Sequence, residues 1–199
     1  MIKIRIFNSS RKSYRKIFIF CFCTVALLPF IGCSGSKLSP EQSIINIIRE
    51  RASQSEKEDT PQTSLKLYSK LLELEPSNIR NHIGFLGAAR KARNQQAFNR
   101  YMSAAVSLPA EKKTTEYIVE VIFTMLDFNS SQNARVFLEE NKGFLSDKET
   151  LFWLSGAIEI SVGNLIEAKE NYEKCLVVNP TYGPCTYDLN SVNSRFRKN

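Results

Sequence analysis

The fold is decided by residues 150–182, which have the sequence TLFWLSGAIEISVGNLIEAKENYEKCLVVNPTY. Apolar side chains recur at helical spacing on both sides of a break at Gly163-Asn164. This pattern predicts two helices, over about residues 149–162 and 165–178. Pro180 ends the second helix, because proline has no backbone N–H and its ring collides with the preceding turn. The stretch therefore predicts a helical hairpin.

Small and aromatic residues indicate how the two helices pack. Gly156 lies on the first helix, and Ala168 and Tyr172 lie four residues apart on the second. Small residues let two helix backbones approach, and an aromatic ring fills the space beside them. Together with Pro180, these positions resemble the tetratricopeptide repeat, a family built from ~34-residue helix–turn–helix units.

The same pattern recurs along the chain. The small residue of the second helix is found 33, 37 and 34 residues apart, at Ser64, Ala97, Ala134 and Ala168. Four places later stand Tyr68, Tyr101, Leu138 and Tyr172. We therefore expect an all-α fold over residues 40–194, a solenoid of about four TPR-like helical hairpins with a C-terminal helix capping its open end. Residues 195–199 are expected to form a frayed tail.

The first 32 residues differ in composition from the rest. They contain six basic residues and no Asp or Glu, and residues 17–31 form an apolar run of 15 residues. A membrane-spanning helix needs ~20 apolar residues, whereas a basic head with a shorter apolar core is typical of a secretory signal. Residues 1–32 are therefore predicted to be a signal peptide.

The end of this signal, Gly32-Cys33, resembles the lipobox of bacterial lipoproteins. In that family the chain is cut before the cysteine, which becomes the lipid-bearing N-terminus. The resemblance implies that Cys33 is lipidated, that residues 33–39 form a short tether, and that the chain is attached to the membrane through its N-terminal lipid. Two alternatives are open, an uncleaved membrane anchor and cleavage at another position.

Charge gives no reason to expect a nucleic-acid partner. Six of the 27 basic residues lie in the predicted signal, which leaves 21 basic and 20 acidic residues in the rest of the chain. A nucleic-acid-binding domain carries a basic face on its folded part. The local group Arg90, Lys91, Arg93 and Arg100 fits the solvated end of a helix.

No motif for catalysis or metal binding is found in the sequence. It contains no HExxH pair, P-loop, glycine-rich dinucleotide turn or serine nucleophile elbow. His82 is the single histidine and has no ligand partner at metal spacing, which is more typical of a surface or packing residue. We therefore expect no enzyme activity, no metal and no cofactor.

The repeat frame predicts a binding surface. In the family, the first helices of the hairpins line a concave groove that holds an extended peptide or a partner helix. The frame set by Ala168 places these residues in the groove: His82, Leu86, Arg90, Val119, Phe123, Leu126, Trp153, Ala157 and Ile160. An apolar strip ending at Arg90 suits a partner segment with hydrophobic anchors and an acid. The alternative for Trp153 is a core position, wedged against the neighbouring hairpin.

Two cysteines follow the signal and Cys33. Cys175 and Cys185 each lie five residues from Pro180, so in an antiparallel hairpin they come to the same level. Bridging requires Cα atoms within ~7 Å and converging side chains. The pair is expected either to form a disulfide or to remain as two small buried thiols.

By resemblance, the chain is expected to be an outer-membrane lipoprotein facing the periplasm, because Ser34 rather than an acid follows Cys33. Small lipoproteins of this build assist the assembly of pili, secretins or other outer-membrane complexes, so the expected function is a protein-binding scaffold for an envelope protein or peptide segment. One alternative is an inner-membrane-anchored, chaperone-like adaptor. The other is a non-catalytic subunit of an envelope enzyme, or an unrecognised enzyme.

Overall fold

The computed structural model describes residues 39–105, 108 and 112–197. The predicted signal peptide and Cys33 lie outside these residues. The described part contains nine α-helices and one short 3-10 helix, and no strand is found in it. The prediction of an all-α fold is therefore confirmed. No helix in these ranges is both long and apolar enough to cross a membrane.

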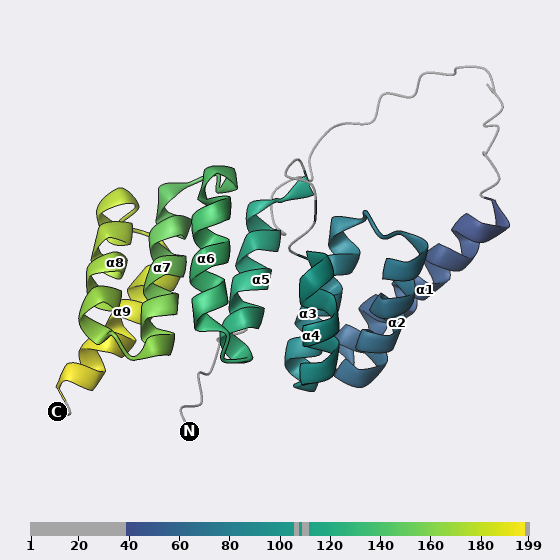
Figure 1. Cartoon of the computed structure of the whole chain (residues 1–199), viewed down its shortest axis with the longest axis horizontal. Coiled ribbons are helices and arrows are strands. Elements are labelled where there is room, and N and C mark those ends of the chain that lie inside the picture. The colour runs from purple at the N-terminus through teal and green to yellow at the C-terminus, as the bar shows by residue number, and fades with distance from the viewer. Residues whose placement is uncertain (1–38, 106–107, 109–111, 198–199) are drawn as a thin grey trace, which may run out of the picture. The chain divides into compact units, whose positions relative to one another are not determined.

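Most of the helices follow one another with short connections (Figure 1). Their bounds are α1 Pro40–Lys57, α2 Pro61–Leu74, α3 Ile79–Ala92, α4 Gln95–Ala105, α5 Thr115–Asp127, α6 Ser131–Asn141, α7 Lys148–Val162, α8 Leu165–Val178 and α9 Gly183–Phe196. The 3-10 helix Lys142–Phe144 lies between α6 and α7. The predicted hairpin corresponds to α7 and α8, and α9 continues two residues beyond the predicted end at residue 194.

Local signals explain where the helices begin and end. The Ser39 side chain accepts a hydrogen bond from the Gln42 N–H, and Pro40 follows at the first helical position, where a missing N–H costs nothing. Gly163 ends α7 with φ 88°, in the left-handed region that glycine adopts without a steric penalty. Prolines likewise begin α2 and stand early in α9.

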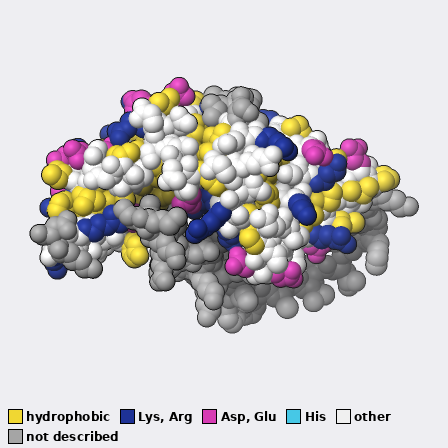
Figure 2. Space-filling view, turned by 60° about the horizontal axis from the view of Figure 1, so that its bottom comes forward, with side chains coloured by type: hydrophobic (Ala, Val, Ile, Leu, Met, Phe, Trp, Pro, Cys, Tyr) yellow, Lys and Arg dark blue, Asp and Glu magenta, His cyan; other side chains and the backbone are white. Residues whose placement is uncertain are grey.

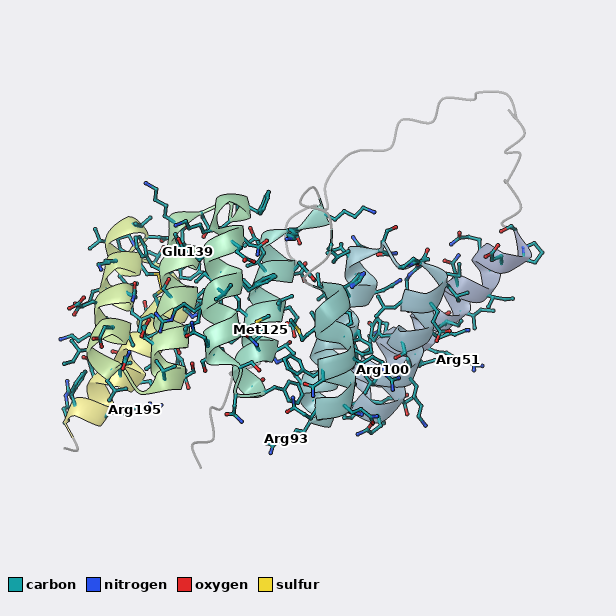
Figure 3. The ribbon with its side chains drawn as sticks, in the orientation of Figure 1. Arg51, Arg93, Arg100, Met125, Glu139 and Arg195 are labelled. Atoms are coloured by element: carbon teal, nitrogen blue, oxygen red, sulfur yellow. A yellow bond between two sulfur atoms is a disulfide. The ribbon has the colours of Figure 1, made fainter. Side chains whose placement is uncertain are left out.

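Most helices that are neighbours in the chain pack against one another. Close packing joins α1 to α2, α2 to α3, α7 to α8 and α8 to α9, and further contacts join α3 to α5 and α5 to α7. The main hydrophobic core lies between α1 and α7, and a smaller one lies between α8 and α9. Among the buried side chains is Met125 of α5, labelled in Figure 3. Trp153 packs against both cores and connects them.

Two glycines allow especially close helix approach. A Cβ atom at Gly84 of α3 would come too close to the ring of Tyr68 on α2, and one at Gly156 of α7 too close to the ring of Tyr172 on α8. The ring in each case lies directly over the glycine backbone. These contacts explain why α2 and α3, and likewise α7 and α8, pack tightly.

A disulfide joins the last two helices. Cys175 near the end of α8 and Cys185 near the start of α9 are bonded, with their Cα atoms 6.4 Å apart and both side chains fully buried. The Cα separation lies in the range that disulfides require. The bond fixes the turn around Pro180 and holds α9 against α8.

Candidate partner-binding face

Direct side-chain contacts run across one face of the odd-numbered helices. We call it the odd-helix face and define it by residues of α3, α5, α7 and α9, namely Gly87, Arg90, Glu120, Phe123, Asp127, Trp153 and Asp188. None of these side chains is fully buried. The face arises because α3 packs on α5 and α5 on α7, while Trp153 reaches from α7 to α9.

Arg90 is the centre of an ion-pair network at the α3–α5 end of the face. Its Nη1 lies 2.7 Å from Glu120 Oε1, and its Nε lies 2.8 Å from Asp127 Oδ2. Burial alone would lower the pKa of the guanidinium, but the charges of Glu120 and Asp127 outweigh it and raise that pKa. Gly87 lies beside this network, and a Cβ atom there would be 3.6 Å from Glu120 Oε1, an ordinary van der Waals contact.

Aromatic rings form the α5–α7 part of the face. The Phe123 and Trp153 ring centroids are 5.0 Å apart, and Trp153 also meets Tyr182 edge to face at 6.2 Å. Trp153 Nε1 donates a hydrogen bond to Asp188 Oδ2 at 2.9 Å. Both Phe123 and Trp153 remain partly exposed, so the face offers ring surface to a partner while the rings themselves are held in place.

Asp188 is a carboxylate in a partly apolar setting. Burial raises its pKa above the ordinary value of 3.8, and the hydrogen bond from Trp153 lowers it only in part. With Glu120 and Asp127 it gives the defined face three carboxylates against the single guanidinium of Arg90. The electrostatic character of the face is therefore acidic.

The structure divides the residues predicted to line a groove into two groups. Arg90, Val119, Phe123, Trp153 and Ile160 lie partly exposed. His82, Leu86, Leu126 and Ala157 are instead buried in the core, so their assignment to an open groove is wrong.

Helix orientation is the reason for this difference. His82 and Leu86 lie two residues either side of Gly84 and therefore on the opposite side of α3 from α2. That side is covered, because His82 meets the rings of Tyr101 on α4 and Tyr117 on α5. The exposed stripe of α5 passes through Glu120, Phe123 and Asp127, and Leu126, one residue away, falls on the inner side.

His82 has a structural setting. Its Nε2 lies 2.7 Å from the Pro76 carbonyl oxygen, and its Nδ1 is bonded to the Tyr101 hydroxyl of α4. Burial lowers its pKa below 6.5, while the bond to the Pro76 carbonyl raises it and the charge of Lys112 lowers it further. Burial also favours the neutral form of the Tyr101 hydroxyl, so it raises the pKa of that group. The imidazole therefore stays neutral and ties α4 to the start of α3.

Sequence reasoning did not find the carboxylates of this face. Glu120 and Asp127 lie 30 and 37 residues after Arg90, and Asp188 lies 35 residues after Trp153. These separations are close to the repeat period. A search of the sequence for opposite charges, or for a donor and an acceptor, about one repeat apart could therefore have found these pairs. In the described ranges, no group of three or more His, Cys, Asp or Glu side chains is placed to hold a metal ion.

No protein-family model matches the chain, and no curated protein matches its sequence at a significant level.

Proposed function

We propose that the chain is a tetratricopeptide-type helical scaffold that binds a segment of another envelope protein on its odd-helix face. The observation that carries this proposal is the partly exposed Phe123–Trp153 pair, held between α5 and α7 and fixed by Asp188. Aromatic anchors that are rigid before binding lose little conformational freedom on association. The repeat spacing of the sequence and the Gly156–Tyr172 contact support the repeat assignment.

The chemistry of the face indicates the kind of segment. Arg90 is already paired with two carboxylates, so it offers little to an acidic partner. The face has three carboxylates against one guanidinium, so its rings suit an apolar side chain with Lys or Arg nearby, which can contact the excess negative charge and the faces of the rings. The proposed partner segment is therefore apolar and basic, in place of the acidic one expected from the sequence.

The attachment of the scaffold is a second part of the proposal. Lipidation of Cys33 would tether the helices to the periplasmic side of the outer membrane, where pili, secretins and other complexes are assembled. Mass spectrometry of the N-terminus of the protein from cells tests this directly. A diacylated or triacylated Cys33 supports it, and an N-terminus at Met1 or an unmodified Cys33 contradicts it.

Photo-crosslinking tests the binding face. A photoreactive phenylalanine analogue at Phe123 should give defined adducts in cells, because this ring is both exposed and on the face. The matched control carries the same analogue at Val136 of α6, which is 48% exposed and lies away from the face. Adducts specific to position 123 identify the partner. Identical adducts from both positions, or none from position 123, would contradict the proposal.

Removing carboxylates from the face tests the expected charge of the partner segment. Glu120→Gln and Asp127→Asn both remove a carboxylate from the face and should weaken crosslinking at position 123 in 50 mM salt. High salt should reduce this difference, since exposed ion pairs are screened. An increase in crosslinking on removing the carboxylates would show that the partner segment is acidic.

A further inference from the structure

We propose that the chain has a second binding site, a pocket between α8 and α9 that receives a carboxylate-bearing apolar segment of a partner protein. The pocket is lined by Ile166, Lys169, Asn193, Phe196 and Arg197. We refer to it as the α8–α9 pocket. It is a different surface from the odd-helix face, so the two proposals can fail independently.

The pocket lies where the start of α8 is close to the end of α9. Cys175 and Cys185 join the end of α8 to the start of α9, so the two helices run antiparallel. Ile166 at the start of α8 is therefore brought beside Phe196 at the end of α9. Arg195, labelled in Figure 3, marks this end of α9. The disulfide also keeps the two walls of the pocket together.

The walls are apolar and shallow. Ile166 is 64% exposed and Phe196 is 42% exposed. Figure 2 shows hydrophobic side chains reaching the surface beside Lys and Arg at this end of the helices. Walls that remain this exposed can cover one aliphatic or aromatic side chain, but they do not enclose a long acyl chain. The occupant indicated is a protein segment rather than a lipid.

The polar lining specifies the charge of the occupant. It consists of the ammonium of Lys169, the guanidinium of Arg197 and the amide of Asn193, and no carboxylate belongs to the lining. Lys169 Nζ lies 3.6 Å from Glu173 Oε1, a long contact between two exposed side chains. Such pairs are weak and exchange readily. A carboxylate next to the inserted apolar side chain could thus be bound by both cations.

The two surfaces use different sides of α9. Asp188 points to Trp153 on α7, whereas Asn193 lies five residues later, about 140° further round the helix. The first side belongs to an acidic face, and the second belongs to a basic pocket. A partner that suits one surface is therefore repelled by the other, and this difference makes the sites selective for different segments.

The test uses the full chain in a mild detergent and three fluorescein-labelled hexapeptides. The first peptide has a central phenylalanine followed by two aspartates; the second has lysines in place of the aspartates; the third has glycine in place of the phenylalanine. Fluorescence anisotropy measures binding of each. We expect only the first peptide to bind, with a dissociation constant in the high micromolar to millimolar range.

Variants then locate the site. Lys169→Glu and Ile166→Ser should each weaken binding of the first peptide, and Lys169→Glu combined with Arg197→Glu should weaken it about tenfold or more. The matched controls are Lys174→Glu and Val177→Ser, both exposed on α8 and absent from the lining. Because Lys169 is partly exposed and the other four positions are exposed, circular dichroism and thermal melting should show an unchanged fold.

Four results would overturn the proposal. One is equal binding of the lysine peptide, and another is binding that the Lys169 and Ile166 variants leave unchanged. The third is self-association of the chain that Ile166→Ser abolishes, which would assign the pocket to a second copy. Failure of the first peptide to bind at millimolar concentration would overturn it as well.

Discussion

The indole N–H of Trp153 donates a hydrogen bond to Asp188 Oδ2 at 2.9 Å, and this bond ties α7 to α9 across 35 residues of sequence. The indole also touches the rings of Phe123 and Tyr182. Trp153 is therefore both a packing residue and part of the odd-helix face. The two interpretations of this residue that the sequence leaves open are not exclusive.

Replacing Trp153 by phenylalanine should change the titration of Asp188. The variant keeps an aromatic ring but removes the donor that lowers the pKa of Asp188, so this pKa should rise further. A carboxylate left without its donor is expected to cost roughly 1–2 kcal/mol of unfolding free energy at pH 7. Because the pKa is raised in the folded state, the cost should shrink as the pH falls through that pKa. Urea unfolding at pH 7 and pH 4.5 measures both effects.

Asp188→Asn provides the control for that experiment. In the Asp188→Asn background, Trp153→Phe has no carboxylate to leave without a donor. Its cost should then be the same at both pH values. A cost that still varies with pH would show that another titrating group is responsible.

Gly84→Ala should destabilise the protein although alanine favours helices. The new methyl group would collide with the Tyr68 ring, and overpacking of this kind costs about 1–3 kcal/mol. Gly87→Ala is the matched control on the same helix, because its nearest neighbour, Glu120 Oε1, is 3.6 Å away. The control should be stabilised by about 0.5–1 kcal/mol. Equal stabilisation of both variants in urea unfolding would contradict the close contact.

Acid should destabilise the fold through His82. Its pKa is lowered in the folded state, so the unfolded chain binds the proton more readily, and stability is lost as the pH falls below about 6.5. The loss cannot exceed about 1.4 kcal/mol per pH unit for a single group. His82→Gln should remove this part of the pH dependence between pH 7 and 5 in urea unfolding. An unchanged slope would show that His82 titrates normally.

Loss of the Cys175–Cys185 bond should destabilise the C-terminal pair of helices. For a sequence separation of 10, the chain-entropy model gives roughly 2.8 kcal/mol. Urea unfolding with and without reductant measures the loss. The Cys175→Ala and Cys185→Ala double variant should be equally destabilised and insensitive to reductant. If reductant shifts the double variant as well, the effect does not arise from this bond.

Helix positions were predictable because their signals are local. Gly163 supplies the left-handed residue that ends α7, and Pro180 prevents the extension of α8. Asn164 precedes α8 and has Glu167 at the capping distance, yet its side chain makes no capping bond and instead donates to Glu159 Oε2 at 2.9 Å. Glu159 is buried beside Arg135, so its second oxygen takes the amide.

Which side of each helix faces solvent was less predictable, because it depends on the helices that pack around it. The repeat frame taken from α7 and α8 predicted that His82 and Leu86 face outward, into a groove. Both are buried, because the side of α3 opposite Tyr68 is covered by Tyr101 of α4 and Tyr117 of α5. Periodicity gives the apolar stripe of a helix, but it does not say which neighbouring helix covers that stripe. The ion pairs of Arg90 depend on the same packing, so a residue expected to be available for a partner is already paired.

The packing of consecutive helices also determines how this chain can fold. Close contacts join helices that are at most two elements apart, so little chain entropy is lost before the first contacts form. Low contact order of this kind favours fast folding, and the closely packed pairs α1–α2, α2–α3, α7–α8 and α8–α9 can each serve as a nucleus. We therefore expect the α8–α9 pair, once its cysteines are oxidised, to retain a covalent loop even when the remaining helices unfold, and to be a starting point for refolding.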